Sequence, residues 1–166
     1  AYFEQSEKYE DDNKGVYFRN NVWWWRKLAQ YVYDSTGEVS EKDYDLWHEN
    51  SGHEVDEDTA IRIADTLEAL MKQGHTAEYQ TVVEKSMVEA EEHNKGVQEK
   101  MLSLRKLVIE MTGKEDITPA DYPKAQHDLW EELYSSKRWE DSYPFTVENV
   151  QEFADFARHS GGFEIC

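Results

Sequence analysis

The sequence predicts an all-α protein, folded as a single-domain bundle of about six helices. Apolar residues repeat at helical spacing in several segments, and residues that favour helix ends stand between these segments. A chain of 166 residues has the size of one domain, and it contains no linker rich in Pro, Gly or Ser. We therefore expect one acidic helical domain over residues 1–166. Residues 1–13 should form a loose N-terminal segment, and any β-structure should be confined to short ends.

The most unusual segment spans residues 14–33, with the sequence KGVYFRNNVWWWRKLAQYVY. It holds half of the six tryptophans and no Asp or Glu, whereas the whole chain has 36 acidic and 18 basic residues. Asn20 or Asn21 is a favourable N-cap, so a helix is predicted from there to about Ser35, ending before Gly37.

The three consecutive tryptophans of this helix separate on a helical wheel drawn at about 100° per residue. Trp24 and Trp25 fall on the broad apolar half, which is expected to join the core. Trp23 falls among polar residues that include Arg26 and Lys27. We therefore expect Trp23 to cover the segment before the helix, to meet another element or to face a partner.

Further helices are predicted from capping residues and from apolar spacing. One is expected at about 41–49, after Ser40, and another from Asp56 or Asp58 to about Gln73. A third should begin at Thr118 and Pro119, with Pro123 in its first turn, and a fourth should follow Thr146. Residues 48–53 are expected to form a loop. Residues 135–145 are expected to form a connector anchored by Trp139, Tyr143 and Phe145.

The longest periodic segment predicts one long helix over about residues 76–112. Its apolar register advances by four and three residues without a break, as in a heptad pattern, at Val83, Met87, Ala90, Asn94, Val97, Met101, Leu104, Val108 and Met111. Gly96 weakens a helix, so the helix is either continuous there or bent near 94–96. The width of the apolar face favours packing inside a bundle. The alternative is a homodimer that associates through the 83–111 face. In such a dimer Asn94 would set the alignment of the helices or the number of chains that associate.

The composition is strongly acidic, with a net charge of −18. Direct nucleic-acid binding is not expected, because phosphate contacts require clustered Lys and Arg; an anionic membrane surface is disfavoured for the same reason. Such acidity either keeps a protein in solution or attracts a basic protein partner, and acidic helices can also mimic nucleic acid. The single cysteine, Cys166, permits no disulfide within the chain. With no signal peptide or apolar run of spanning length, we expect a cytoplasmic protein.

Two motifs stand near the ends of the chain: Asn-Asn-X-Trp-Trp-Trp-Arg within residues 18–32, and Gly-Gly-Phe-X-Ile-Cys within residues 143–166. Together with residues 52–70, which look like a middle helix, these spans resemble a family of small proteins of unknown function from bacteria and their phages. Some members of that family carry Cys-X-X-Cys elements before the Tyr-Pro-Phe segment. This sequence has no cysteine there, so the resemblance implies no zinc site, and it implies no activity.

Two pairs of acids at i,i+3 spacing lie on the last two predicted helices: Asp128 with Glu131, and Glu152 with Asp155. Two such pairs that face each other can bind Mg²⁺ for phosphate chemistry. The pattern is similar to that of all-α nucleotide pyrophosphohydrolases of the MazG type, which use ExxE followed by ExxD. Here the first position is Asp, and other acid pairs of this chain match half the pattern, so a chance match is easy.

A second candidate site, which we call the basic-aromatic island, combines cations, amides and one outward-facing ring. It comprises Arg19, Asn20, Asn21, Trp23, Arg26 and Lys27. Such a set at a helix N-terminus can hold an anion or a nucleotide base, because free N–H groups and the helix dipole favour negative charge there. The plainer interpretation is an aromatic core helix whose Arg and Lys pair with neighbouring acids.

These observations leave three functional hypotheses. The first is a non-enzymatic acidic interaction protein without a cofactor, such as a phage-type inhibitor or accessory factor, that binds a basic partner. The second is the Mg²⁺-dependent nucleotide pyrophosphohydrolase, and the third is binding of a small anionic ligand or nucleotide at the basic-aromatic island.

Overall fold

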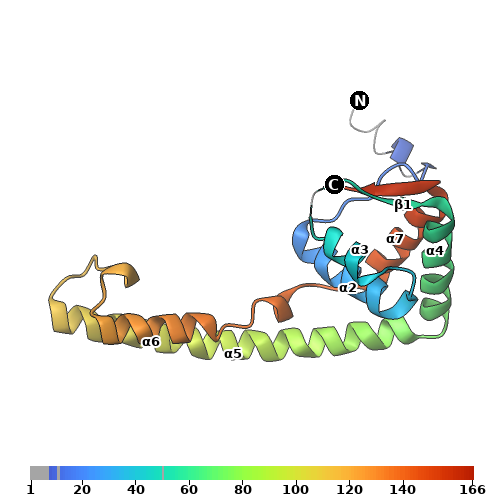
Figure 1. Cartoon of the computed structure of the whole chain (residues 1–166). Helices are drawn as coiled ribbons and strands as arrows, with labels where there is room; N and C mark the ends of the chain where they lie inside the picture. Colours follow the sequence, from blue (N-terminus) through green and yellow to red (C-terminus); the bar gives the residue numbers. More distant parts are fainter. Residues whose placement is uncertain (1–7, 11, 50) are drawn as a thin grey trace. The chain divides into compact units, whose positions relative to one another are not determined.

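The fold of the chain, as a computed structural model, is all-α with one small two-stranded sheet (Figure 1). This confirms the predicted fold class, including the long helix. The structure describes residues 8–10, 12–49 and 51–166, so most of the predicted loose segment 1–13 lies outside the described residues. Among the described residues, no helix is long and apolar enough to cross a membrane.

The chain divides into two compact units. Unit 1 comprises Ala1–Glu84 and Tyr143–Cys166, and unit 2 comprises Lys85–Ser142. The prediction of a single domain over 1–166 stays a prediction. The segments that carry the family resemblance all belong to unit 1.

Helix α2 (Val22–Thr36) forms as the sequence predicts, because both of its ends are specified locally. The side chain of Asn21 accepts hydrogen bonds from the backbone N–H groups of Trp23 and Trp24. Gly37 ends the helix in the left-handed conformation, with φ of 67°. The face turned to the core buries Leu28, Ala29, Tyr31 and Val32.

The next elements of unit 1 are α3 (Glu41–Leu46), β1 (His53–Asp56) and α4 (Glu57–Lys72). Ser40 and Asp56 cap the two helices with their side chains, as predicted. The sequence did not predict β1: its first residue, His53, was assigned to a loop. Strand β1 pairs antiparallel with β2 (Gly162–Ile165), which places Val55 opposite Phe163. The pairing joins segments more than a hundred residues apart, so no local signal marks it.

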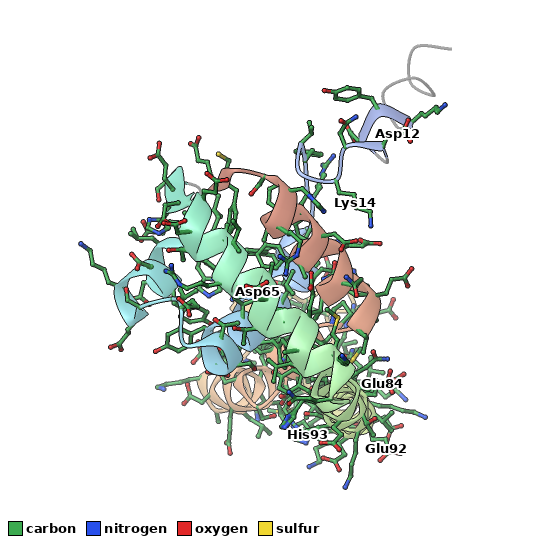
Figure 2. The ribbon with its side chains drawn as sticks, turned by 90° about the vertical axis from the view of Figure 1, so that its right-hand side faces the viewer. Asp12, Lys14, Asp65, Glu84, Glu92 and His93 are labelled. Carbon is green, nitrogen blue, oxygen red and sulfur yellow. The ribbon has the colours of Figure 1, made fainter. Side chains whose placement is uncertain are left out.

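Helix α7 (Val147–His159) begins after its predicted cap, Thr146, and packs against α4. Small buried residues on both helices allow a close approach: Ala60 and Ala64 on α4, and Ala154 and Ala157 on α7. Arg158 then joins the helices, donating to Asp65 (2.5 Å) and Glu68 (2.8 Å). Asp65 lies on the face of α4 that Figure 2 presents.

Helix α5 (His75–Thr112) is continuous through Gly96, so the expected long helix is confirmed and is not interrupted there. Its buried side chains recur every seven residues over most of its length, at Thr76, Val83, Ala90, Val97 and Leu104. In unit 1, the buried hydroxyl of Thr76 bonds to the Tyr31 hydroxyl at 2.9 Å, which satisfies both groups.

In unit 2, the later turns of α5 pack against α6 (Lys124–Ser135), which runs beside them (Figure 1). The core of this helical pair consists of Leu104, Val108, Ile117 and Tyr122, with Trp130 packed against it. The heptad face therefore finds partners within its own chain over these turns.

Asn94 also has a partner within the chain. Its carboxamide accepts from the backbone N–H of Arg138 (2.8 Å) and donates to the carbonyl of the same residue (3.1 Å). These two bonds hold the segment after α6, at Arg138, against α5. Asn94 thus has a structural role that the heptad pattern did not indicate.

The helix predicted from Thr118 is wrong in its boundaries. Pro119–Asp121 form only a turn of 3₁₀ helix, called η1, and α6 starts at Lys124, so that Pro123 precedes the helix. The reason is steric, because the residue before a proline is pushed out of the helical region. Tyr122 is accordingly extended, with ψ of 145°.

Of the three anchors predicted for the connector 135–145, only Phe145 is buried, at 3% exposure. Tyr143 is half-buried and Trp139 is 50% exposed. The connector includes a second 3₁₀ turn, η2 (Glu140–Ser142). The aromatic side chains of this segment therefore do not all act as core anchors.

The bonds of Asn94 lead to a test of stability. Replacing Asn94 with Leu should lower the free energy of unfolding by about 1–3 kcal/mol, because the backbone N–H and carbonyl of Arg138 lose their partner. The heptad pattern alone predicts the opposite, since Leu would extend the apolar register. Urea unfolding followed by circular dichroism measures the difference.

Met101→Leu, seven residues further along the same register, is the matched control. It should change the free energy of unfolding by less than about 1.5 kcal/mol. A stabilised Asn94→Leu variant would contradict the assigned role of Asn94.

Candidate ligand-binding pocket

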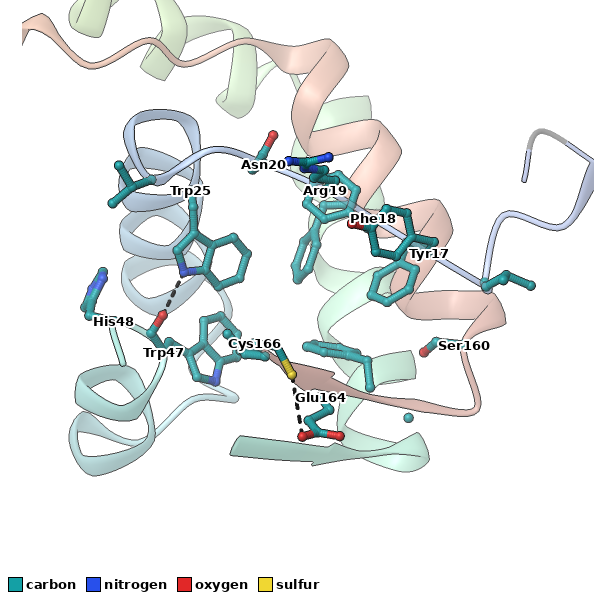
Figure 3. A pocket seen from close by; sticks show the side chains of 18 of the residues that line it. Tyr17, Phe18, Arg19, Asn20, Trp25, Trp47, His48, Ser160, Glu164 and Cys166 are labelled. Atoms are coloured by element: carbon teal, nitrogen blue, oxygen red, sulfur yellow. Dashed lines mark hydrogen bonds between the residues drawn. The ribbon is translucent and has the colours of Figure 1, made fainter. Parts of the chain in front are cut away.

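Unit 1 contains a pocket of about 790 Å³. Its walls come from the segment before α2 (residues 14–20, here called the leading segment), from α2, from the end of α3, from α7, and from β2 with the C-terminus. Figure 3 shows Trp25 and Trp47 on one side, Tyr17 and Phe18 on the other, Arg19 and Asn20 at one end, and Glu164 and Cys166 at the opposite end. The volume falls within the usual range of small-molecule sites.

Aromatic rings form most of the apolar wall, and Phe153 lies at their centre with 1% exposure. The ring of Phe18 lies 5.3 Å from that of Phe153 and 5.8 Å from that of Phe156. Trp25 lies 5.6 Å from Trp47, and its indole N–H donates to the Trp47 carbonyl at 2.7 Å. These contacts fix the rings in place, so the pocket is largely pre-formed.

The leading segment lies directly against the C-terminal end of α7. A Cβ atom on Gly15 would stand 2.0 Å from the His159 carbonyl oxygen, so only glycine permits this approach. One residue earlier, Lys14 forms an ion pair with Asp155 of α7. The contact partner of Gly15 lies too far along the chain to be inferred from the sequence.

The cations of the pocket are Arg19 and Arg26, both exposed. Among the described residues, neither has a hydrogen bond or an ion pair. The other arginines are all engaged: Arg62 with Glu38, Arg138 with Asp141, Arg158 with α4, and Arg105 with the Glu115 carbonyl. In a chain with twice as many acids as bases, two unpaired guanidinium groups at one pocket are unusual.

His48 lies at the same pocket, in contact with the ring of Tyr44. Partial burial lowers the pKa of its imidazole, and the positive charge of Arg26 lowers it further, against the opposing effect of Asp45. His48 is therefore neutral near pH 7, and its ring offers one donor and one acceptor to the pocket. Because its pKa is lowered on folding, His48 makes the fold less stable as the pH falls below the ordinary value of about 6.5.

Glu164 and Cys166 form the opposite end of the pocket (Figure 3). The Cys166 thiol donates to Oε1 of Glu164 at 3.5 Å. This bond, with a smaller effect of burial, raises the pKa of the thiol. The thiol consequently stays protonated at neutral pH, which does not suit a nucleophile.

Two donors in the pocket wall have no partner among the described residues: Nδ2 of Asn20 and Nε1 of Trp47. Both atoms are covered by protein, so a molecule in the pocket reaches neither donor unless the wall moves. An unpaired buried donor costs about 1–3 kcal/mol. Bonding of either donor to a ligand after a small movement of the wall would recover part of that cost.

The structure divides the basic-aromatic island. Arg19, Asn20 and Arg26 line the pocket, whereas Asn21 caps α2 and Lys27 is half-buried outside the lining. Trp23 is 51% exposed, and its ring lies 5.0 Å from that of Tyr143.

No sequence pattern indicated the other half of the pocket, which is formed by Trp47, His48, Phe153, Phe156, Phe163, Glu164 and Cys166. Most of these residues belong to the C-terminal segment, from Phe153 to Cys166. Its approach to the leading segment carries no local signal.

In the part of the chain that the structure describes, the two acid pairs belong to different units: Asp128 and Glu131 to unit 2, and Glu152 and Asp155 to unit 1. No group of three or more His, Cys, Asp or Glu side chains there is placed to hold a metal ion. Asp128 forms an ion pair with Lys124, and Glu131 lies 3.5 Å from His127. Asp155 is engaged by Lys14, and nothing in the described geometry favours the Mg²⁺-dependent hydrolase.

A scan of the chain against protein-family models, a search of curated proteins and a search of solved structures found no match. The resemblance to the bacterial and phage family stays a prediction. The function is therefore inferred from the geometry of the pocket.

The bond between Cys166 and Glu164 gives a chemical test of the pocket's end. Glu164→Gln should lower the pKa of the Cys166 thiol, because the thiol loses a negatively charged acceptor. At one mildly alkaline pH the thiolate fraction then rises, by about tenfold for each pKa unit. Alkylation by iodoacetamide, followed by mass spectrometry, should accelerate accordingly.

Glu54→Gln is the control, because Glu54 lies opposite Glu164 in the two-stranded sheet. It should leave the alkylation rate nearly unchanged. Equal acceleration in both variants would mean that general negative charge, and not the bond to Glu164, holds the thiol protonated.

Proposed function

We propose that the chain is a binding protein whose pocket in unit 1 takes a small molecule with a flat aromatic ring and an anionic group, of the size of a mononucleotide. This proposal develops the hypothesis of anion or nucleotide binding at the basic-aromatic island. It moves the site from the outer face of α2 to the pocket that Arg19, Asn20 and Arg26 share with the C-terminal segment.

The unpaired arginines are the observation that carries the proposal. The remaining arginines of the chain bond to protein groups, whereas Arg19 and Arg26 have no such bond among the described residues. Guanidinium groups bind carboxylates and phosphates through paired N–H donors. An anionic group of the ligand would complete their hydrogen bonding.

The aromatic wall of the pocket supports the proposal that the ligand carries a flat aromatic ring. Phe18 and Trp25 are half-buried and line the pocket with large rings, whereas Trp47 is only 2% exposed and packs against Trp25. Rings held in place by their neighbours stack on a flat ligand at little entropic cost. A concave site that combines several aromatic rings with a few charged groups is typical of small-molecule recognition.

The groups at the far end of the pocket favour binding over covalent chemistry. The Cys166 thiol has a raised pKa, and Glu164, which accepts its hydrogen bond, carries negative charge. That carboxylate would repel an anionic group, so the ligand is expected to place its charge toward Arg19 and Arg26 and its ring toward Trp25 and Trp47.

Isothermal titration with adenosine monophosphate and with adenosine tests this proposal directly. The nucleotide is expected to bind, and removal of its phosphate should weaken binding. Arg19→Gln and Arg26→Gln should each reduce affinity about tenfold or more, because a charge-assisted hydrogen bond contributes about 1.5–3 kcal/mol.

Arg105→Gln is the matched control, because Arg105 belongs to unit 2 and donates only to a backbone carbonyl. It should leave affinity unchanged. Equal binding of the nucleotide and the nucleoside, or equal losses in all three variants, would contradict an anion site at Arg19 and Arg26.

The hypothesis of a basic protein partner stays a prediction. The exposed pair of Trp23 and Tyr143 could anchor a protein. However, Arg26 and Lys27 follow Trp23 by three and four residues and therefore share its side of α2. A contact centred on Trp23 would consequently favour an acidic or neutral partner surface.

A further inference from the structure

Unit 2 has an apolar groove of about 670 Å³ between α5 and α6. Leucines from both helices line it, and Gly96 and Ser103 provide small residues on its α5 side. Leu107 and Leu129 are 47% and 44% exposed. The groove shares Leu104 with the packed seam, and its other α5 residues lie outside the heptad register.

A pair of helices shares only one seam and leaves apolar side chains uncovered on either side of it. In unit 2 these exposed residues include Leu102, Leu107, Met111, Leu129 and Tyr134. Two helical pairs commonly cover such faces by forming a four-helix bundle. The shape and the charges of α5 indicate which partner fits.

The shape complementarity involves Gly96 and Leu107. They are eleven residues apart, about three turns of helix, so they lie on the same stripe of α5. A Cβ atom built on Gly96 meets no atom within 4 Å, which leaves open space at that position. If two copies of α5 pack antiparallel about a two-fold axis, Leu107 of each copy lies over Gly96 of the other.

The charges support the same alignment. Lys95, Glu99, Lys106 and Glu110 lie on one flank of α5, next to the groove, and none of them has an ion pair among the described residues. In an antiparallel pair centred between residues 102 and 103, Glu99 faces Lys106 of the second copy, and Lys95 faces Glu110. The Gly96–Leu107 contact has nearly the same centre, so one register satisfies shape and charge together.

We propose that the occupant of this groove is a second copy of the chain. The two α5–α6 pairs associate antiparallel about a two-fold axis, with each Leu107 in the groove of the other copy and two symmetry-related pairs of Glu99 with Lys106 at its edge. A two-fold interface is self-complementary, so every contact occurs twice. This inference is independent of the pocket in unit 1 and of any ligand bound there.

Sedimentation equilibrium on the full chain tests the association. The unaltered protein is expected to be a dimer, and Leu107→Glu should weaken the dimer by about a hundredfold or more, because it places a charge at the centre of the interface. Val88→Glu is the matched control, because Val88 is similarly exposed on α5 but lies about four turns from the proposed centre and does not line the groove. A monomeric unaltered protein, or equal losses in both variants, would overturn the proposal.

A charge exchange tests the register and does not alter the apolar surface. Glu99→Lys and Lys106→Glu should each weaken the homodimer, by about tenfold, because each places like charges opposite one another twice. A mixture of the two single variants should form a heterodimer, since both facing pairs become opposite in charge. The double variant should recover the homodimer.

The control for the exchange is Glu91→Lys, which changes charge on α5 away from the proposed flank and should leave the dimer intact. Failure of the two single variants to associate when mixed would overturn the register. Circular dichroism of each variant confirms that the helices are retained.

Discussion

Unit 1 depends on the packing of rings around Phe153. This buried residue of α7 contacts Phe18 of the leading segment, Trp25 of α2 and Phe163 of β2, at ring-centroid distances of 5.3, 5.9 and 5.8 Å. Segments from the two ends of the chain thus meet on one side chain. Because edge-on and tilted ring contacts have preferred geometries, the cluster fixes the orientations of these segments as well as their proximity.

The pocket is a consequence of this cluster. The leading segment reaches α7 only because Gly15 has no side chain, and β2 is held by its pairing with β1. With both walls fixed, the bulky rings leave a space that they cannot fill themselves. The Arg19 guanidinium at one end of this space and the Glu164 carboxylate at the other make the electrostatic potential differ along it, which favours one orientation of a ligand with a single charged end.

The sequence predicted the helices well where their ends are specified locally. Asn21 and Gly37 define α2, and Asp56 and Thr146 define the starts of α4 and α7, each through a cap that depends only on neighbouring residues. The strands were not predicted, because the pairing of β1 depends on the distant C-terminal segment. The predicted position of Pro123 inside a helix was wrong, because proline keeps the preceding residue, Tyr122, in an extended conformation.

For the site, the sequence identified three of the pocket's polar residues and overlooked the segments opposite them. Arg19, Asn20 and Arg26 stood out because their segment lacks acids in an acidic chain. No local pattern could show that His48 and Cys166 face the same space, since that follows from long-range packing. In unit 2, the heptad pattern predicted the long helix and favoured packing within a bundle, in agreement with the contacts of Leu104 and Asn94 inside the chain. A homodimer through the 83–111 face stays a prediction.

The most direct test of the central claim, that the aromatic pocket of unit 1 is the functional site, is a nuclear magnetic resonance titration. The indole N–H signals of the six tryptophans are followed as adenosine monophosphate is added. The signals of Trp25 and Trp47, which line the pocket, should shift, while those of Trp130 and Trp139 in unit 2 should stay in place. Shifts confined to Trp130 and Trp139, or no shift of Trp25 and Trp47 at saturation, would contradict the assignment.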